Sequence, residues 1–214
     1  MIVPFVFAAA LSAAPLRLTV AGDSLALGIG ASDSSHGFAF DLFRRIEARR
    51  PGSVVTDLAV GGATAADVDR LESPRVRATR PDLVLLEAGA NDAVRRRTAA
   101  AFARDYARLV AHVAAASPGA TLVLFNVPDV SVSPIFETGA KPALHRLVAA
   151  YNVAVAAQAR RRRLRVVDLY AVSQAARSDA ARWFGADLFH PSDDGHARIA
   201  AAAWPVVRDA IASR

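Results

Sequence analysis

The residues most able to do chemistry lie near the two ends of the chain. Ser24 follows an apolar run at 16–21, and Asp187 and His190 stand three residues apart before the last helical stretch. A serine hydroxyl becomes an effective nucleophile when a base takes its proton. A carboxylate that orients the base makes this proton transfer more effective. We predict Ser24 as the nucleophile, His190 as the base, and Asp187 as the carboxylate that accepts from His190 Nδ1.

Acyl transfer to a serine also needs hydrogen-bond donors for the oxyanion that develops. The candidates are the backbone N–H groups of Ser24 and Gly62 and the side-chain amide of Asn91. Each well-aimed donor lowers the barrier by on the order of 3 kcal/mol. Glycine at position 62 allows the backbone to approach a ligand closely, and the Asn91 amide is a donor that does not titrate. These three groups are the predicted oxyanion hole.

The segments that must position these residues alternate between strand-length apolar runs and longer helical patterns. The predicted strands are 16–21, 53–60, 82–88, 120–126 and 164–169. The predicted helices are 37–50, 64–72, 99–116, 141–162 and 194–212. Five βα units predict an α/β protein: a single domain with three α/β/α layers around a parallel five-stranded sheet.

All of the candidate residues fall on one rim of that predicted sheet. Ser24, Gly62 and Asn91 follow the first three strands, and Asp187 and His190 precede the last helix. Ligands bind at the carboxyl ends of the strands in open parallel sheets, so this convergence is stronger evidence than any single residue.

A long connection at 127–140 follows the fourth predicted strand and reaches the same rim. Such loops often line substrate sites, although an ordinary surface loop is an equal alternative. Ile135 and Phe136 within it would favour an apolar acyl chain.

Four segments in order resemble the blocks of the SGNH (GDSL-type) hydrolases. They are Gly22-Asp23-Ser24-Leu25, residues 57–64 with Gly62 at the oxyanion glycine, Gly89-Ala90-Asn91-Asp92, and residues 187–191 with the Asp-x-x-His spacing. The resemblance extends over nearly the whole chain from Leu16. It implies a flavodoxin-like fold and hydrolysis of carboxylic esters or thioesters through an acyl-serine, as in a GDSL-type esterase or lipase. It implies no metal and no cofactor.

Two positions depart from the pattern of that family. Asp57 stands where the second block usually begins with asparagine, and Ala90 stands where the third block often has a second glycine. We interpret Asp57 as a loop support, and we expect the Ala90 methyl to narrow the site without removing a catalytic group.

Alternative functions have weaker support in the sequence. One is a catalytically inactive ligand-binding module of the same fold. Another is dinucleotide binding through Gly28-Ile29-Gly30, but the third glycine of that motif is missing and the pattern begins beyond the strand end. We interpret Asp23 and Asp92 as loop organisers. The remaining histidines are interpreted as surface or packing residues: His36, His112, His145 and His196.

The overall composition narrows the choice of partners. The chain has 214 residues, a net charge of +6 and no cysteine, which excludes thiolate nucleophiles and Cys-ligated zinc. Lys141 is the only lysine, so the positive charge is an arginine bias that does not require nucleic acid as a partner. The arginine runs at 95–97 and 160–163 are expected to be solvated surface. We expect a small-molecule acyl ester as substrate, while the acyl chain, the alcohol and the oligomeric state stay open.

The first fourteen residues carry no charged side chain. Ser12-Ala13-Ala14 resembles a cleavage site behind an apolar stretch, but a basic segment at the start is missing. We therefore expect a signal-like segment at 1–14, an SGNH hydrolase domain at 15–214, and a secreted or cell-envelope location, with the cytoplasm as the alternative. The stretch is too short for a stable membrane span.

Overall fold

Five parallel strands form one sheet, as the sequence predicts. The computed structural model describes residues 13–212. The strands are β1 (Arg17–Ala21), β2 (Val54–Asp57), β3 (Leu83–Leu86), β4 (Thr121–Phe125) and β5 (Arg165–Val167). Their order in the sheet is β2-β1-β3-β4-β5, and every neighbouring pair is parallel. The sheet therefore reverses its direction of growth beside β1, the strand that leads into Ser24.

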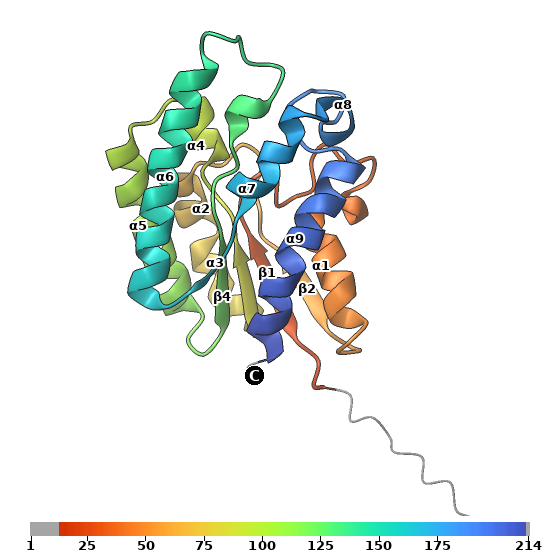
Figure 1. Ribbon diagram of the computed structural model, residues 1–214. Coiled ribbons are helices and arrows are strands. Elements are labelled where there is room, and N and C mark those ends of the chain that lie inside the picture. The colour runs from red at the N-terminus through yellow and green to blue at the C-terminus, as the bar shows by residue number, and fades with distance from the viewer. Residues whose placement is uncertain (1–12, 213–214) are drawn as a thin grey trace, which may run out of the picture.

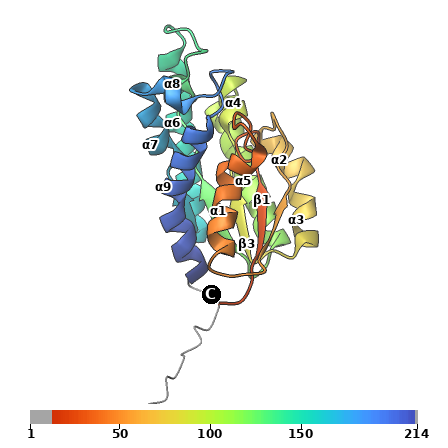
Figure 2. The same ribbon diagram turned by 90° about the vertical axis from the view of Figure 1, so that its right-hand side faces the viewer.

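Helices cover both faces of this sheet (Figures 1 and 2). One face carries α1 (Phe38–Glu47), α7 (Leu169–Gln174), α8 (Ala180–Trp183) and α9 (Asp193–Ala212). The other carries α2 (Ala65–Leu71), α3 (Ser73–Thr79), α4 (Ala90–Val94), α5 (Ala99–Ala116) and α6 (Lys141–Arg162). Short 3₁₀ turns lie at η1 (Ser34–His36), η2 (Val130–Val132) and η3 (Ala175–Arg177). The three-layer α/β/α architecture is confirmed.

The central strand β3 shows why the layers form. All four of its residues are buried. Leu83 and Leu85 pack into the core under α1 and α9, while Val84 and Leu86 pack into the core under α5 and α6. Successive side chains of a strand point to opposite faces, so a continuous apolar run must be covered on both sides.

Four short helices differ from the prediction. The segments α3, α4, α7 and α8 have four to seven residues each. A helix of one or two turns is too short for the apolar repeat at three and four positions to be recognised in a sequence. The second strand is also shorter than the predicted 53–60, since β2 ends at Asp57. Beyond it, Leu58 N and Val60 N still donate to the carbonyls of Val20 and Gly22, at 2.9 and 3.0 Å, so this segment stays beside β1 and its extension.

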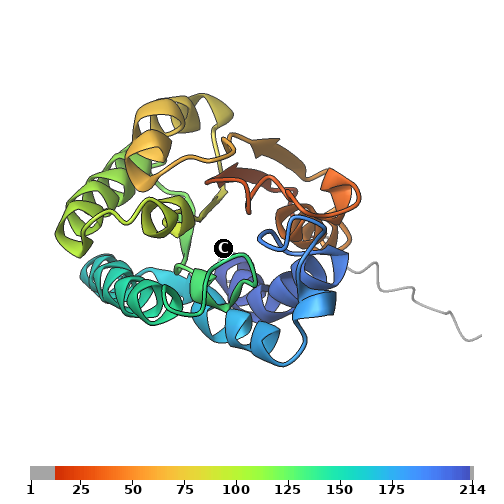
Figure 3. The ribbon, with the colours of Figure 1, turned by 90° about the horizontal axis from the view of Figure 1, so that it is seen from above.

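The segments that follow β1, β3 and β4 and the segment that precedes α9 meet at the upper end of the molecule, as the view from above shows (Figure 3). The predicted signal-like segment at 1–14 falls almost entirely outside the described residues. Within residues 13–212, no helix combines the length and the apolar character needed to cross a bilayer.

Candidate active site

The three residues predicted to do chemistry lie in hydrogen-bond contact. Ser24 Oγ is 2.9 Å from His190 Nε2, and His190 Nδ1 is 2.6 Å from Asp187 Oδ2. An ionised carboxylate only accepts hydrogen bonds, so Nδ1 carries the ring proton and Nε2 is left to accept from the Ser24 hydroxyl. Ser24 itself is 8% exposed. The structure thus joins residues that are 166 positions apart in the sequence.

The Asp187–His190 turn is held by its own backbone. Asp187 Oδ1 accepts from the N–H groups of Phe189 and His190, each at 2.9 Å, and Leu188 takes a left-handed conformation with φ of 58°. Burial acts to raise the pKa of Asp187, but the hydrogen bonds from the His190 ring and from the two backbone N–H groups outweigh it and lower that pKa. The carboxylate is therefore charged at neutral pH and able to stabilise an imidazolium.

The backbone and Cβ of His190 pack against the loop after Ser24. Gly30 has φ of 95°, and a Cβ on it would lie 2.6 Å from the His190 Cβ. Ser32 then fixes the loop to the start of α9, because its N–H and Oγ both donate to the Asp193 carboxylate, at 2.8 and 2.7 Å. The packing of this loop thus explains the glycine at position 30 of the Gly28-Ile29-Gly30 segment.

The predicted oxyanion donors have the hydrogen-bonding state that such a role needs. Within residues 13–212, neither Ser24 N–H nor Gly62 N–H donates to a protein acceptor. Gly62 has φ of 77°, which favours glycine, and its carbonyl accepts from Arg95 at 2.9 Å. The Asn91 amide donates one N–H to Asp23 Oδ2 at 3.0 Å, and among the described residues its second N–H has no acceptor.

Buried carboxyl groups lie beneath the Ser24 loop. Glu72 Oε2 accepts from Gly22 N at 2.8 Å, Glu87 Oε2 accepts from Asp23 N at 3.4 Å, and Asp23 Oδ1 accepts from Leu25 N at 2.9 Å. Burial raises the pKa of Glu72 to about 8. Burial, followed by the charge of Asp23, raises the pKa of Glu87 well above its ordinary value. Neutral glutamic acids therefore surround Asp23, the residue that holds the Asn91 amide.

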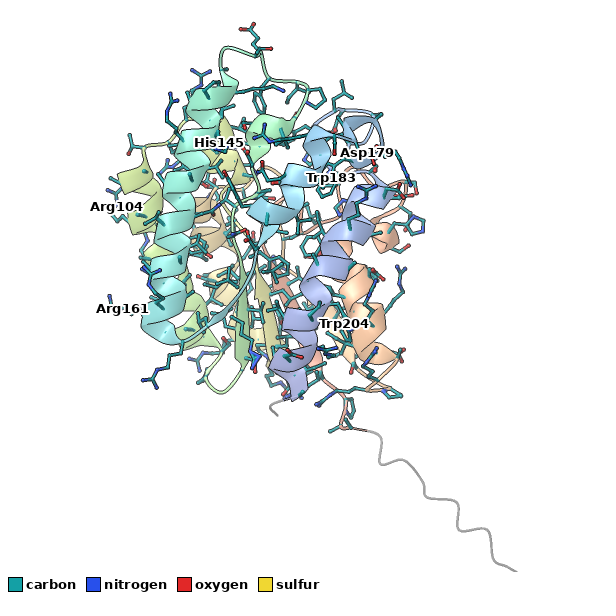
Figure 4. All side chains as sticks on the ribbon, viewed as in Figure 1. Arg104, His145, Arg161, Asp179, Trp183 and Trp204 are labelled. Carbon is teal, nitrogen blue, oxygen red and sulfur yellow. The ribbon has the colours of Figure 1, made fainter. Side chains whose placement is uncertain are left out.

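The sequence suggested solvated surface for the arginine run at 95–97. Arg95 is exposed, as expected, but Arg97 is half-buried and lies between two carboxylates, so the expectation was wrong for Arg97. Arg95 holds the Gly62 carbonyl, as described above. Arg97 Nε lies 3.1 Å from Asp92 Oδ1, and its terminal nitrogen donates to Asp105 at 2.5 Å. Asp92 in turn accepts from Ala65 N at 2.8 Å, so it ties the start of α2 to α4. By contrast, Arg161 on α6 points away from the protein (Figure 4).

The other histidines are held by contacts away from Ser24. His196 lies inside α9, fully buried, with Nδ1 accepting from Phe38 N at 3.3 Å and Nε2 3.1 Å from the Ile29 carbonyl. Burial lowers its pKa, so the ring is neutral. His36, His112 and His145 each contact a carboxylate. In the described part of the chain, no group of three or more His, Asp or Glu side chains is arranged to hold a metal ion.

A cavity of about 60 Å³ opens beside Ser24 and His190. Its walls come from the 128–133 part of the predicted long connection and from α7, α8 and α9, with Trp183 in the upper half of the molecule (Figure 4). Ile135 and Phe136, which the sequence suggested as substrate contacts, do not line it. Ile135 is exposed, and Phe136 packs edge-on against Phe189. Trp183 was not among the residues predicted for the site, although Trp183-Phe184 is an apolar pair just before the Asp-x-x-His block.

Comparison with known proteins agrees with this geometry. The profile of the GDSL-like lipase/acylhydrolase family matches residues 20–198. The chain belongs to this family. As a GDSL-like acylhydrolase it is a carboxylic ester hydrolase, and its substrates are small-molecule esters. No curated protein matches the sequence.

Solved structures share the fold of this GDSL-like hydrolase at low sequence identity. TesA is similar with a TM-score of 0.71 and 22% identity, over 91% of this chain and 99% of that one. A lipolytic G-D-S-L protein from Veillonella parvula is similar with a TM-score of 0.72 and 16% identity, over 90% of this chain and 98% of that one. A catalytic mutant of the acetylxylan esterase Axe2 from Geobacillus stearothermophilus is similar with a TM-score of 0.73 and 19% identity, over 92% of this chain and 96% of that one. At these identities the likeness shows the fold alone.

Proposed function

We propose that this GDSL-like hydrolase cleaves carboxylic esters, or thioesters, through an acyl-serine intermediate. Ser24 Oγ attacks the acyl carbonyl while His190 Nε2 takes the hydroxyl proton. The resulting imidazolium gives that proton to the leaving alcohol or thiol. A water molecule, deprotonated by the same nitrogen, then attacks the acyl-serine and releases the acid.

The oxyanion of each tetrahedral intermediate is assigned to three donors. They are the free N–H groups of Ser24 and Gly62 and the second N–H of the Asn91 amide. Two backbone amides without protein acceptors would be costly in a closed site, and a developing negative charge is the ligand that satisfies them best. Asp23 fixes the rotation of the Asn91 amide, so this donor is oriented before the substrate arrives.

The observation that carries the proposal is the 2.9 Å contact between Ser24 Oγ and His190 Nε2, with Nδ1 already held by Asp187. A ligand-binding module without catalysis would not need a serine, an imidazole and a carboxylate joined by hydrogen bonds in this way. No contact in the site favours that alternative.

The test compares the wild type with Ser24→Ala on p-nitrophenyl esters. We expect kcat to fall by at least about 10⁴-fold, since loss of a serine nucleophile removes nearly all of the catalysis in such enzymes. The control is Ser178→Ala, which alters an exposed serine distant from Ser24 in the sequence and should leave kcat unchanged. A fluorophosphonate should label Ser24 and no other serine. Equal rates in wild type and Ser24→Ala would refute the mechanism.

A further inference from the structure

We propose that the cavity beside Ser24 is an acyl-chain subsite that selects straight apolar acyl groups of about five to seven carbons. The inference rests on the proposed function, because it takes Ser24 as the atom that holds the acyl carbon. It adds the substrate class, which neither the triad nor the family determines.

The position of the cavity fits an acyl chain attached at Ser24. Ser24 and His190 form one part of its wall, and Leu25, Leu169 and Ile199 form another. Those three side chains are 1–6% exposed, and they belong to the core between the sheet and α9. A chain that leaves the carbonyl in this direction therefore passes from the reactive atoms into the apolar core.

The cavity wall also includes Asp129, but its carboxylate is fully used by the protein. Asp129 is 0% exposed, and five side-chain or backbone donors reach its two oxygens. The donors are Ser131 N, Ser131 Oγ, His145 Nδ1, Gln174 Nε2 and the Arg177 guanidinium. This network holds the 128–133 segment against α6 and α7. Both oxygens of Asp129 already accept hydrogen bonds from the protein.

The two serines in the wall, other than Ser24, are satisfied in the same way. Ser173 Oγ accepts from Asp129 N at 2.9 Å and donates to the Tyr170 carbonyl at 2.8 Å. Ser133 Oγ donates to the Leu188 carbonyl at 2.7 Å and accepts from Ile135 N at 3.2 Å. Asp23 also borders the cavity, and its two oxygens accept from Leu25 N and Asn91 Nδ2. Apart from these polar groups, Ser24 and His190, the side chains of the wall are aliphatic or aromatic. A sugar hydroxyl buried here would lose its water without gaining a partner, whereas a hydrocarbon chain would not.

The volume sets the length of the chain. A single water needs about 10–15 Å³ on the same measure, so about 60 Å³ has room for roughly four to six groups of that size. A methylene is of similar size, and the carbonyl carbon stays outside at Ser24. An acetyl group would leave most of the space empty, and the carbons of a long fatty acyl chain beyond about the seventh would lie outside the cavity. Hexanoyl is therefore close to the expected optimum.

The first experiment varies the acyl chain from acetyl to dodecanoyl while the alcohol stays p-nitrophenol. We expect kcat/KM to rise by up to about fourfold per methylene to a maximum near hexanoyl, which corresponds to ~0.8 kcal/mol per buried methylene, and then to fall. A second series keeps the acyl group at acetyl and lengthens an unbranched alcohol. If the rate follows the length of the alcohol instead, the cavity holds the leaving group and the proposal is wrong.

The second experiment changes the cavity at Ile199 on α9. Ile199→Ala enlarges it and should raise the octanoyl-to-hexanoyl ratio of kcat/KM by about fourfold or more, while Ile199→Phe should lower the hexanoyl-to-acetyl ratio by about tenfold. Ile211→Ala is the matched control, since it truncates a buried isoleucine of the same helix that does not line the cavity. Both of its ratios should stay at the wild-type values.

The outcomes separate the two proposals. Hydrolysis that survives Ser24→Ala refutes the mechanism itself. Hydrolysis that depends on Ser24 but is fastest with acetyl, or whose chain-length optimum is the same in the wild type and both Ile199 variants, leaves the mechanism intact and refutes the acyl subsite.

Discussion

The backbone of Gly30 lies directly against the side chain of His190. A Cβ on Gly30 would stand 2.6 Å from the His190 Cβ and 2.5 Å from the Pro191 carbonyl oxygen. Both distances are well below any that a real Cβ tolerates. The loop after β1 thus carries Ser24, the proposed nucleophile, and also contacts His190, the proposed base, so one segment sets the separation of the two groups.

Gly30→Ala should therefore lower kcat. The added methyl forces the His190 backbone or the loop to shift, and a displacement of about 1 Å in a catalytic group costs on the order of 10²-fold in rate. The left-handed φ at this position adds strain, so the melting temperature should fall as well. Gly139→Ala is the control, since a Cβ there would meet nothing within 4 Å. If Gly30→Ala turned over esters at the wild-type kcat, the close contact between Gly30 and His190 would not be needed to position the histidine.

Asp187→Asn should reduce kcat by on the order of 10³-fold while changing KM little. The amide can donate to Nδ1, which favours the ring tautomer with its proton on Nε2, and this nitrogen then cannot accept from Ser24. Steady-state kinetics of wild type and Asp187→Asn on the same p-nitrophenyl ester check this, and an unchanged kcat would contradict the role of Asp187.

Asp23→Asn should lower kcat by about tenfold through the Asn91 amide. Only one atom of the new side chain accepts, so either Leu25 N or Asn91 Nδ2 loses its partner. The fall should appear in kcat with KM nearly unchanged, because an oxyanion donor acts mainly in the transition state. Asp57→Asn is the comparison, since an asparagine can still accept from Ala59 N. Equal loss in the two variants would mean that Asp23 does not position Asn91.

Glu72→Gln should change how stability depends on pH. Burial holds the pKa of Glu72 at about 8, against an ordinary value of 4.5 in the unfolded chain. Between these values the folded state binds more protons, so its stability is full below about pH 4.5 and falls by up to ~1.4 kcal/mol per unit as pH rises toward 8. The glutamine is already neutral and keeps an acceptor for Gly22 N.

The measurement is chemical denaturation of wild type and Glu72→Gln at several pH values between 5 and 8. The difference in unfolding free energy should grow in favour of the variant as pH rises. Burial also raises the pKa values of Glu87, Asp23 and Asp92, so the variant should retain part of the slope. Glu47→Gln, at an exposed position of α1, should track the wild type. A constant difference at all pH values would show that Glu72 is ionised in the folded protein.

The sequence predicted the sheet and the long helices because their apolar patterns extend over enough residues. The ranges 99–116 and 141–162 are the observed limits of α5 and α6. The positions of Ser24, Asp187 and His190 followed from a topological rule: parallel strands bring their carboxyl ends to one edge. The rule needs only the order of elements, so it holds even where strand ends were misplaced.

The parts that the sequence did not reveal depend on contacts between distant residues. In the sequence, Arg97 is one member of a run of arginines. Only the fold shows that it lies between Asp92 and Asp105. The wall of the cavity comes from α7, α8 and α9, of which two are too short to show a pattern. Burial of Glu72 and Glu87 was likewise invisible, since a glutamate in a sequence is expected to face water.

The hydroxyl and the imidazole that lie 2.9 Å apart come from residues separated by 166 positions in the sequence. During synthesis, Ser24 and the strands of the sheet are made before His190. If the proposed mechanism holds, a nascent chain therefore cannot hydrolyse esters until the Asp-x-x-His turn has left the exit tunnel and docked. Onset of hydrolysis in a stalled-ribosome series would then mark, to within a few residues, when the last part of the fold closes.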